Sequence, residues 1–444
     1  MFKKLFIFLL FVIFASLRLV NLSGRMPFAW DQVRDIKAVQ TIIQFHHPTL
    51  IGPVVRGNGG FLLGPLYYYL LLPAQLFTHG SPLALAFISI IIFLSFLLGL
   101  YFLPKSTFMA LALISLFGFS WHFIGFSQIS WNAALILPYT LAVFWLYSHW
   151  SKLGFSRVLP LSAFLWGLAW QVHPSVFFLI PLVWLFKLRQ VSWRSFIISF
   201  LALLFSLSPL ILFDLRHQFL NFHLLIKFFS TSHSSLNLGF IIQPLLTKFF
   251  LTISFWLLGF PQLYLGLLIF ILVFGSFWFH RRQSLAQFSW WLIVVNLLGL
   301  FFLHDPNFAE YYFLPSALAV FWLLVLWLDH LPNLLKISTL ILFVVVNLTH
   351  YQFVTAPYSL RTKQAVVQTI VAKTRVADIS LQLPLGRTFG FDYLFHHNGL
   401  IFKPRTKLKI IVTDNSAKLS LPPTARLLSV SPAFNYKVIF FVVE

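Results

Sequence analysis

Acidic side chains are rare in this chain, and their positions are the first clue to its chemistry. Only 10 Asp and Glu occur among 444 residues. An ionised group at the centre of a bilayer costs about 2.5–3.5 kcal/mol on insertion scales, so acids in so apolar a chain lie in loops or serve a function. Residues 1–352 hold Asp31, Asp35, Asp214, Asp305, Glu310 and Asp329.

Asp31 and Asp35 are four residues apart, with Arg34 beside them. On a helix this spacing places both carboxylates on one face. The pattern fits a general base held at a membrane surface. It fits equally a solvated helix face with a local ion pair, and the sequence leaves both interpretations open.

Four further polar clusters contain side chains that can bind a substrate, although each also fits an ordinary helix end. An Arg–His pair after an apolar run suits an anion such as phosphate, because a guanidinium can bind two oxygens at once. The clusters are QISWN with Gln128, Trp131 and Asn132; WQVHP with Gln171 and His173; FDLRHQFLN with Asp214, Arg216 and His217; and LHDPNFAEYYF with Glu310 and Tyr311.

No cofactor site is evident in the sequence. The pairs His46-His47 and His396-His397 are adjacent, which is poor geometry for one tetrahedral metal site, and the HExxH and GxxxxGK[ST] motifs are absent. The chain has no Cys, hence no thiolate ligand and no cysteine nucleophile. We assign no cofactor, and a divalent-metal requirement stays open.

Composition assigns these residues to a membrane protein. Hydrophobic residues make up 59% of the chain and charged residues 9%, against roughly 25% charged in globular domains. Apolar runs long enough to span a bilayer recur along the chain, which predicts an all-α polytopic fold. The net charge of +21 would suggest nucleic acid in a soluble protein. Here the positive charges fall between apolar runs, where they indicate topology and contact with anionic lipids, and no nucleic-acid module is present.

Charge also predicts the topology. Lys3 and Lys4 place the N-terminus in the cytoplasm, and residues 23–61 then form the first outer loop, with an amphipathic surface helix from Asp31 to Phe45. If the runs 62–78 and 240–258 do not cross, the basic loops fall inside, giving eleven crossings and an outer C-terminus. Five of the six acids in residues 1–352 then lie outside. Thirteen crossings is the alternative count.

The runs 158–172 and 175–187 are too short to span comfortably, since 15 residues of helix reach roughly 22 Å. We expect a hairpin of two short helices whose tip, Gln171 to Pro174, lies in a protein-lined cavity. One long tilted helix is the alternative.

Residues 353–444 form a second domain after the membrane domain of residues 1–352. They carry 12 Lys and Arg against 4 acids, and no run long enough to span. We predict a helix within Ser359–Arg375 and strands at Arg387–Phe395, Lys407–Thr413 and Lys437–Val443. The segment is therefore expected to be a small α/β domain on the outer face.

Together these segments resemble GT-C membrane glycosyltransferases, above all the bacterial family-39-like enzymes related to protein mannosyltransferases and lipid A aminoarabinose transferases. WDQVRD is similar to the acidic motif in that family's first outer loop, where an aromatic residue precedes the catalytic Asp, here Asp31. The family often has Asp-Glu, whereas this chain has Asp31-Gln32, which leaves the role of the second acid open or moves it to Asp35.

The resemblance covers most of residues 1–352. GPVVRGNGGFLLGPLYYYLLLP resembles the Pro-Leu-Tyr segment that follows the acidic motif. QISWNA is similar to a Ser-Arg-x-x-Trp-Asn-Pro motif without its Arg and Pro, and GLAWQVHPS and FDLRHQFLN look like further motifs.

The resemblance implies a GT-C-like fold in the bacterial cell membrane. It also implies an inverting transfer from a polyprenyl-phosphate sugar to a glycan, lipid or protein acceptor at the outer face. Asp31 would be the general base, with Asp35 as its possible substitute, and Arg216, His217 and Arg56 would hold the phosphate. The other residues expected to bind substrate are Arg34, Tyr67, Gln128, Trp131, Asn132, Gln171, His173, Asp214, Glu310 and Tyr311.

Two other classes remain open. A transporter or flippase for lipid-linked sugars would also be polytopic, although such proteins often show inverted repeats, and no repeat is visible here. The departures at Gln32, Gln128 and Ala133 are compatible with an inactive scaffold in a polysaccharide assembly complex. Sugar transfer by the purified protein in detergent, where no gradient exists, would distinguish the enzyme from both.

Overall fold

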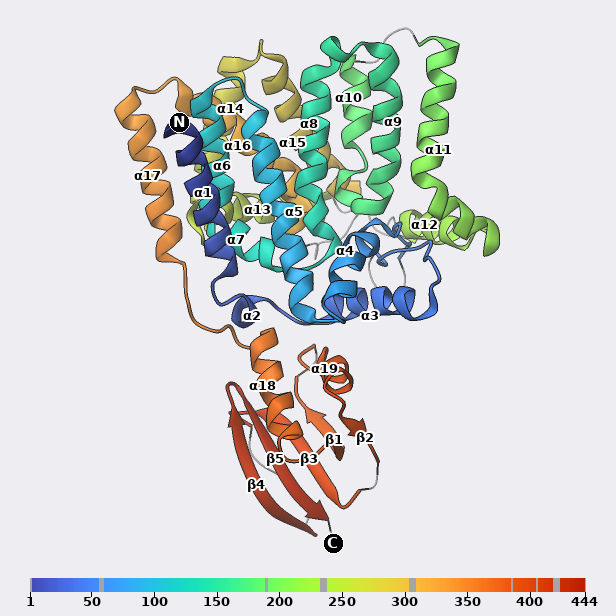
Figure 1. Ribbon diagram of the computed structural model, residues 1–444. Coiled ribbons are helices and arrows are strands. Elements are labelled where there is room, and N and C mark those ends of the chain that lie inside the picture. Colours follow the sequence, from blue (N-terminus) through green and yellow to red (C-terminus); the bar gives the residue numbers. More distant parts are fainter. Residues whose placement is uncertain are drawn as a thin grey trace.

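The computed structural model describes residues 2–55, 60–187, 191–231, 238–302, 309–384, 386–404, 406–417 and 424–443. A bundle of helices is followed by a small domain built on a five-stranded sheet. The N-terminus lies at the end of the bundle opposite the small domain (Figure 1). The two ends of the chain therefore lie on opposite sides of the bundle.

The bundle consists of the helices α1 to α17, and the first begins at Phe2. The α-helices are α1 (Phe2–Leu19), α2 (Leu22–Arg25), α3 (Trp30–Phe45), α4 (Leu66–Phe77), α5 (Pro82–Phe102), α6 (Thr107–Phe119), α7 (Trp121–Gln128), α8 (Ile136–Leu153), α9 (Phe155–Val172), α10 (Leu179–Lys187), α11 (Trp193–Arg216), α12 (Leu220–Thr231), α13 (Leu238–Leu258), α14 (Leu263–His280), α15 (Ser284–Phe302), α16 (Leu314–Asp329) and α17 (Asn333–Thr349). Short 3₁₀ turns interrupt them at η2 (Asn132–Leu135), η3 (Pro174–Val176) and η4 (Glu310–Phe313).

Several of these helices are suited to a bilayer. Among the described residues, five are long and apolar enough to cross one, namely α5, α11, α14, Ser284–Phe301 of α15, and Glu310–Asp329 of η4 and α16. Helices α6 and α7 meet at a 64° bend and form a sixth candidate span. Shorter apolar helices accompany them, which confirms a polytopic membrane protein. The number of crossings stays a prediction.

Helix α16 forms the centre of the bundle. Of the 18-residue apolar segment that could cross a bilayer, 83% is buried in α16. The corresponding segments of α11 and α14 are each 22% buried. A helix that is apolar on all sides belongs in a core, and one buried on a single stripe presents its other faces to lipid. The bundle is therefore arranged around α16, with α11 and α14 at its periphery.

The expected helical hairpin is present. Helix α9 ends at Val172, η3 follows, and α10 begins at Leu179, so the single long helix considered above is wrong. Pro174 occupies the first position of η3, where its missing N–H costs nothing, and His173 is extended. This break turns the chain back inside the bundle at the predicted position.

The expected amphipathic helix is also present as α3. Its inner side buries Ile36 and Val39 completely, whereas Trp30 is 56% exposed. Figure 1 shows α3 lying across the end of the bundle that faces the small domain. Position and amphipathicity together fit a helix at the membrane surface.

A short β-like hairpin links α3 to α4. Gly52 N donates to Leu63 O at 2.7 Å and Val55 N donates to Phe61 O at 2.9 Å, while Gly64 N donates to Trp170 O at 3.1 Å. A side chain at Gly64 would come within 2.4 Å of Gln171, so only glycine allows this approach. The hairpin is thereby fixed against the end of α9.

The C-terminal domain packs helices against one mixed sheet. Its elements are α18 (Leu360–Val371), β1 (Val376–Gln382), α19 (Phe391–His397), β2 (Ile401–Phe402), β3 (Leu408–Asp414), β4 (Ala425–Ala433) and β5 (Tyr436–Val443). The strand order is β2-β1-β3-β5-β4, with β1 parallel to β2 and β3 and with β5 antiparallel to β3 and β4. The expected α/β domain is confirmed.

One strand of the expected set is wrong. Arg387–Phe395 holds the start of α19, which begins after Gly390 at a φ of 90°. Phe391, Leu394 and Phe395 are all fully buried, which is a helical spacing that the aromatic, strand-like composition of the segment concealed. Strands β1, β2 and β4 were not predicted.

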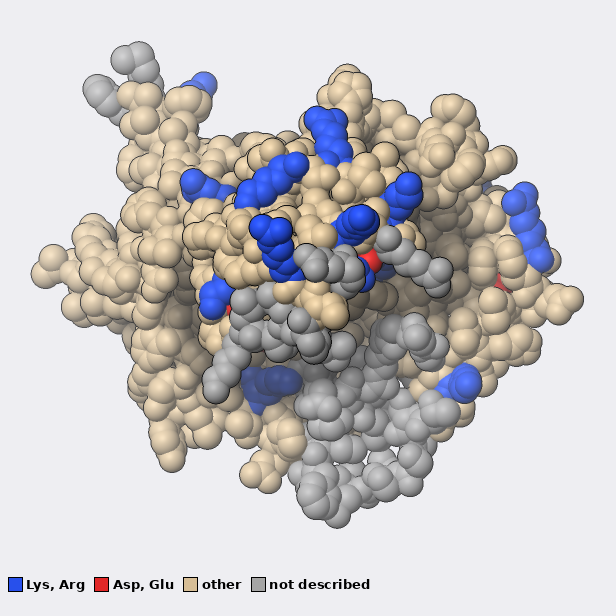
Figure 2. Space-filling model, turned by 90° about the horizontal axis from the view of Figure 1, so that it is seen from below, with Lys and Arg blue, Asp and Glu red and all other residues tan. Residues whose placement is uncertain are grey.

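Among the charged residues visible on the side of the C-terminal domain, Lys and Arg far outnumber Asp and Glu. Figure 2 shows many Lys and Arg side chains there and only a few Asp or Glu. This agrees with the 12 basic residues against 4 acids in residues 353–444.

Candidate active site at the membrane surface

One arginine joins the two carboxylates of α3. Arg34 Nη1 lies 2.7 Å from Asp31 Oδ1, and Arg34 Nη2 lies 2.7 Å from Asp35 Oδ1. Arg34 Nε also donates to Asp35 Oδ1 at 2.8 Å. The four-residue spacing of Asp31 and Asp35 thus lets both carboxylates pair with the guanidinium of Arg34.

The two carboxylates differ in exposure. The Asp31 side chain is 40% exposed, whereas that of Asp35 is completely buried. Burial raises the pKa of Asp35 to about 7, against the lowering effect of Arg34. A substrate can therefore reach Asp31, while Asp35 is placed to hold Arg34.

The start of α3 is fastened to the bundle by the residue that follows Asp31. Gln32 Oε1 accepts a hydrogen bond from Ala29 N at 3.0 Å, and Gln32 Nε2 donates to Ser130 O at 2.7 Å. The Ser130 hydroxyl lies 2.7 Å from that of Tyr67, which is fully buried. Gln32 and Tyr67 both bond Ser130, and through it they hold the start of α3, which carries Asp31, against the bundle.

Aromatic side chains from three further segments converge near Asp31. The ring centroids of Trp131 and Tyr311 are 4.5 Å apart, and His173 lies 5.4 Å from Tyr311 and 4.6 Å from Tyr312. The charge of Asp31 acts on the Tyr311 hydroxyl. Trp131 Nε1 is buried and has no hydrogen-bond partner within the described ranges. We call Trp131, His173, Tyr311 and Tyr312 the aromatic wall.

The amide side chains near the hairpin tip hold the backbone together. Gln171 Nε2 donates to Ser206 O at 2.5 Å, and Asn132 Nδ2 donates to Val172 O at 2.9 Å. Gln128 Nε2 donates to Arg18 O at 2.7 Å and ties α7 to α1. The amide nitrogens of all three residues thus bond backbone carbonyls of neighbouring segments and stabilise the fold around the site.

The FDLRHQFLN segment lies at the junction of α11 and α12. Asp214 Oδ1 accepts from Asn221 N at 2.7 Å, and the Asn221 amide binds both backbone groups of Leu62. Arg216 and His217 are exposed, and His217 Nδ1 lies 2.8 Å from Phe213 O. Within the described ranges, no contact joins these residues to Asp31 or Asp35.

The remaining expected residues are less informative. Glu310 is exposed at the start of η4. Arg56 lies outside the described residues. Among the residues that the structure describes, no three His, Asp or Glu side chains are grouped as metal ligands.

Two residues near the site were not predicted. Tyr68 approaches Arg34 and both carboxylates, and Tyr312 completes the aromatic wall. The signal for both was the tyrosine repetition in LYYYL and EYYF, because adjacent tyrosines on a helical turn point in different directions. Of these two runs, only Tyr67 and Tyr311 are among the expected site residues.

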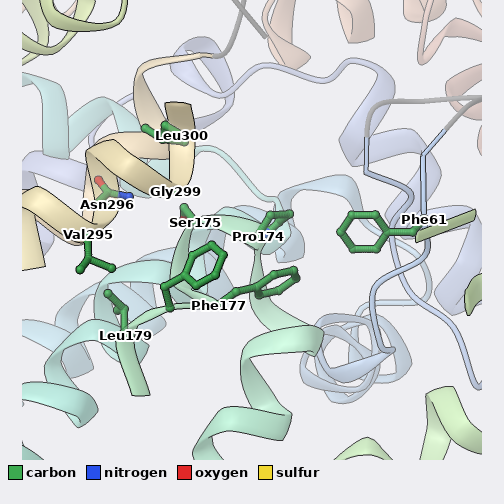
Figure 3. Close-up of a pocket in the computed structure, with 10 residues that line it drawn as sticks. Phe61, Pro174, Ser175, Phe177, Leu179, Val295, Asn296, Gly299 and Leu300 are labelled. Carbon is green, nitrogen blue, oxygen red and sulfur yellow. The ribbon is translucent and has the colours of Figure 1, made fainter. Parts of the chain in front are cut away.

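An apolar pocket lies beside the hairpin tip (Figure 3). Helices α10 and α15, η3 and the hairpin before α4 contribute to it. Most of the lining side chains are aliphatic or aromatic. The lining residues are Phe61, Pro174, Ser175, Phe177, Phe178, Leu179, Val295, Asn296, Gly299 and Leu300.

Two solved structures share this architecture along the whole chain. They are crystal structures of ArnT from Cupriavidus metallidurans, one bound to undecaprenyl phosphate and one in the apo state. Each is 12% identical in sequence, with TM-scores of 0.58 and 0.60, and the alignments cover 98% and 99% of this chain and 98% of ArnT. No protein-family model and no curated protein matches the sequence. The chain therefore has the GT-C-like fold of ArnT, with the predicted membrane bundle and small C-terminal domain.

Proposed function

We propose that this protein transfers a sugar from a polyprenyl-phosphate donor to an acceptor hydroxyl, with inversion and with Asp31 as general base. The observation that carries the proposal is an open carboxylate, clamped by Arg34, beside an aromatic wall at the membrane surface. The fold shared with ArnT supports the same reaction class. The reaction takes place at the face that bears the C-terminal domain, which is the outer face of the membrane.

One base is sufficient for this chemistry. A lipid phosphate is already a good leaving group, so no acid is needed to protonate it. Asp31 takes the proton of the acceptor hydroxyl as the oxygen attacks the anomeric carbon from the face opposite the phosphate. Two working carboxylates would be the arrangement of a glycosidase, whereas here Asp35 is buried against Arg34.

The donor is proposed from the surroundings of the site. One of the ArnT structures is bound to undecaprenyl phosphate. In the present chain an apolar pocket of about 20 Å³ adjoins the hairpin tip. Its lining matches a prenyl chain in chemistry, but this volume holds about one water molecule and not the chain itself. We assign the phosphate to Arg216 and His217, which are exposed at the end of α11.

Substitution of the base tests the mechanism. Asp31→Asn retains shape and loses the proton acceptor, so transfer by purified protein in detergent should fall by about 10²–10⁴ while donor affinity is retained. Asp329→Asn, which removes a carboxylate at the other end of the bundle, is the control. Wild-type turnover in Asp31→Asn would refute the mechanism, and loss in Asp35→Asn alone would move the base one helical turn.

Substitution of the phosphate ligand tests the donor assignment. If Arg216 contacts the phosphate more strongly as it leaves, Arg216→Ala lowers the catalytic rate; if it binds only the ground state, the donor KM rises and the rate is unchanged. Polyprenyl-phosphate sugars and nucleotide sugars should be compared as donors. Equal transfer from a nucleotide sugar, or no change of either parameter, contradicts the assignment.

A further inference from the structure

A cleft separate from the apolar pocket lies between α3 and the C-terminal domain, and Arg34 is part of its lining. Its volume is about 540 Å³, within the usual range for a small-molecule site. Helix α3 supplies Trp30, Val33, Arg34 and Lys37, whose spacing places them along one helix face. The C-terminal domain supplies the opposite wall, formed by Leu381, Thr388, Phe389, Gly390 and Asp392.

The two walls of this cleft are fastened together at one end by a buried lysine. Lys363 Nζ donates to Phe28 O at 2.7 Å and to Phe389 O at 2.6 Å. Phe28 precedes α3, and Phe389 lines the cleft. Lys363 is 1% exposed, so these bonds are shielded from water.

A tyrosine fastens the walls a second time. Tyr393 OH accepts a hydrogen bond from Gln40 Nε2 at 2.7 Å and donates one to Gly80 O at 2.5 Å. Gln40 lies on α3, and Tyr393 lies on α19. With these bonds and those of Lys363, the cleft is a preformed site rather than a gap between two loosely joined domains.

The lining of the cleft suits a sugar. Trp30 is 56% exposed and meets Phe389 edge to face, with ring centroids 4.9 Å apart, so an indole surface is open to a flat apolar face such as that of a pyranose ring. Asp392 accepts hydrogen bonds, Lys37 donates them and Thr388 does both. Arg34 is already paired with Asp31 and Asp35, which leaves Lys37 and Asp392 as opposite charges and favours a neutral ligand.

We propose that this cleft binds a pyranose unit of a carbohydrate acceptor. The inference deepens the proposed function and rests on it. Donor and acceptor can both contain a pyranose, and we commit to the acceptor. The cleft is bounded by a surface helix and the C-terminal domain, whereas a lipid-linked donor keeps its prenyl tail among the apolar helices of the bundle. Arg34 lines the cleft and contacts Asp31, so an acceptor held there lies beside the base.

Protection of an introduced thiol tests this assignment directly. The chain has no Cys, so Thr388→Cys provides a single reactive thiol in the cleft of the full-length protein. Methyl pyranosides of glucose, galactose, mannose and N-acetylglucosamine are the probes. We expect at least one of them to slow labelling of Thr388→Cys by a small maleimide at least about threefold.

Two controls isolate the cleft. Ser380→Cys lies on β1 beside Leu381, is exposed, and points to the opposite face of the strand, so its labelling should not change. Trp30→Ala in the Thr388→Cys background should abolish the protection. Phe45→Ala, which removes a comparably exposed aromatic from the far end of α3, should retain it.

Kinetics provide a second readout. Trp30→Ala should raise the KM for the acceptor roughly three- to tenfold and leave the donor KM unchanged. The inference is overturned if no glycoside protects Thr388→Cys, if Ser380→Cys is protected equally, or if only the polyprenyl-phosphate sugar protects. Protection requires no donor and no turnover. Protection without any transfer therefore refutes the proposed function alone, and transfer without protection refutes the cleft alone.

Discussion

Two acids one helical turn apart have different environments in this protein. The Asp31 side chain is 40% exposed to solvent, whereas that of Asp35 is fully buried. Arg34 contacts both, so the charge of Asp35 holds the guanidinium that in turn orients Asp31. The unpaired Asp35 Oδ2 shows that this carboxylate is held by one oxygen only.

The raised pKa of Asp35 predicts how activity depends on pH. Burial moves this pKa from 3.8 to about 7, so lowering the pH through 7 protonates the carboxylate and weakens its hold on Arg34. Transfer should fall between about pH 8 and pH 6. Asp35→Asn has no proton to bind there, so it should be less active than wild type at pH 8 and show a flatter profile.

The same group has the opposite effect on stability. A raised carboxyl pKa means that the folded chain binds the proton more tightly than the unfolded chain does. Ionisation of Asp35 therefore lowers the unfolding free energy as the pH rises from about 4 to about 7. Thermal unfolding of wild type and Asp35→Asn across this range measures the effect. If transfer by Asp35→Asn still fell between about pH 8 and pH 6 as it does in wild type, the role given to Asp35 in activity would be contradicted.

At the scale of elements, local patterns in the sequence predicted the pieces that form the site. The apolar spacing along α3 predicted a surface helix, and His173-Pro174 marked the break between α9 and α10, because the residue before a proline is biased toward an extended backbone, and His173 is extended. Helical spacing alone placed Asp31 and Asp35 on one face. These features depend on neighbours within a turn or two, which a single sequence displays.

Contacts between distant residues could not be predicted in this way. The Asn221 amide that binds Leu62 and the Lys363 ammonium that binds Phe28 are joined over 159 and 335 residues. Gln32, Gln128 and Asn132 were noted as motif residues, but their backbone partners depend on how the helices pack. The segment of α19 has a strand-like composition, and its helical form depends on the packing of its buried side chains against the rest of the domain.

Lys363 provides a test of how one element positions another. Lys363→Met leaves the carbonyls of Phe28 and Phe389 without their partner, at about 1–3 kcal/mol for each unpaired group. We expect a lower unfolding temperature and reduced transfer, because the start of α3 loses its tie to α18. Lys403→Met is the control, since Lys403 is exposed in the same domain and should change stability by less than about 0.5 kcal/mol. Equal stability and activity of Lys363→Met and wild type would show that the tie is dispensable.

At the scale of the whole molecule, the site lies where two different environments meet. On one side of Asp31 the bundle offers apolar walls. On the other, the C-terminal domain forms one wall of the cleft and has a surface rich in Lys and Arg (Figure 2). Helix α3 lies between the two and carries Asp31, the proposed base. The proposed lipid-linked donor and carbohydrate acceptor would then approach Asp31 from opposite sides.

This arrangement requires the C-terminal domain to lie outside and the N-terminus inside, which single-cysteine labelling can establish. Eleven crossings place Lys105 and Arg194 in the cytoplasm, whereas thirteen crossings, with α4 and α13 both spanning, place them outside. Arg282 is cytoplasmic under both counts and serves as a control, and Lys403 reports the C-terminal domain. All four residues are exposed, and the chain has no native Cys.

An impermeant maleimide added to intact cells should label Lys403→Cys and spare Lys105→Cys, Arg194→Cys and Arg282→Cys. All four should react once the membrane is permeabilised. The physical reason is the positive-inside rule, since a count of eleven keeps the basic loops between helices on the cytoplasmic side. Labelling of Lys105→Cys and Arg194→Cys in intact cells would establish thirteen crossings. Protection of Lys403→Cys would place the C-terminal domain, and with it Asp31, on the cytoplasmic side.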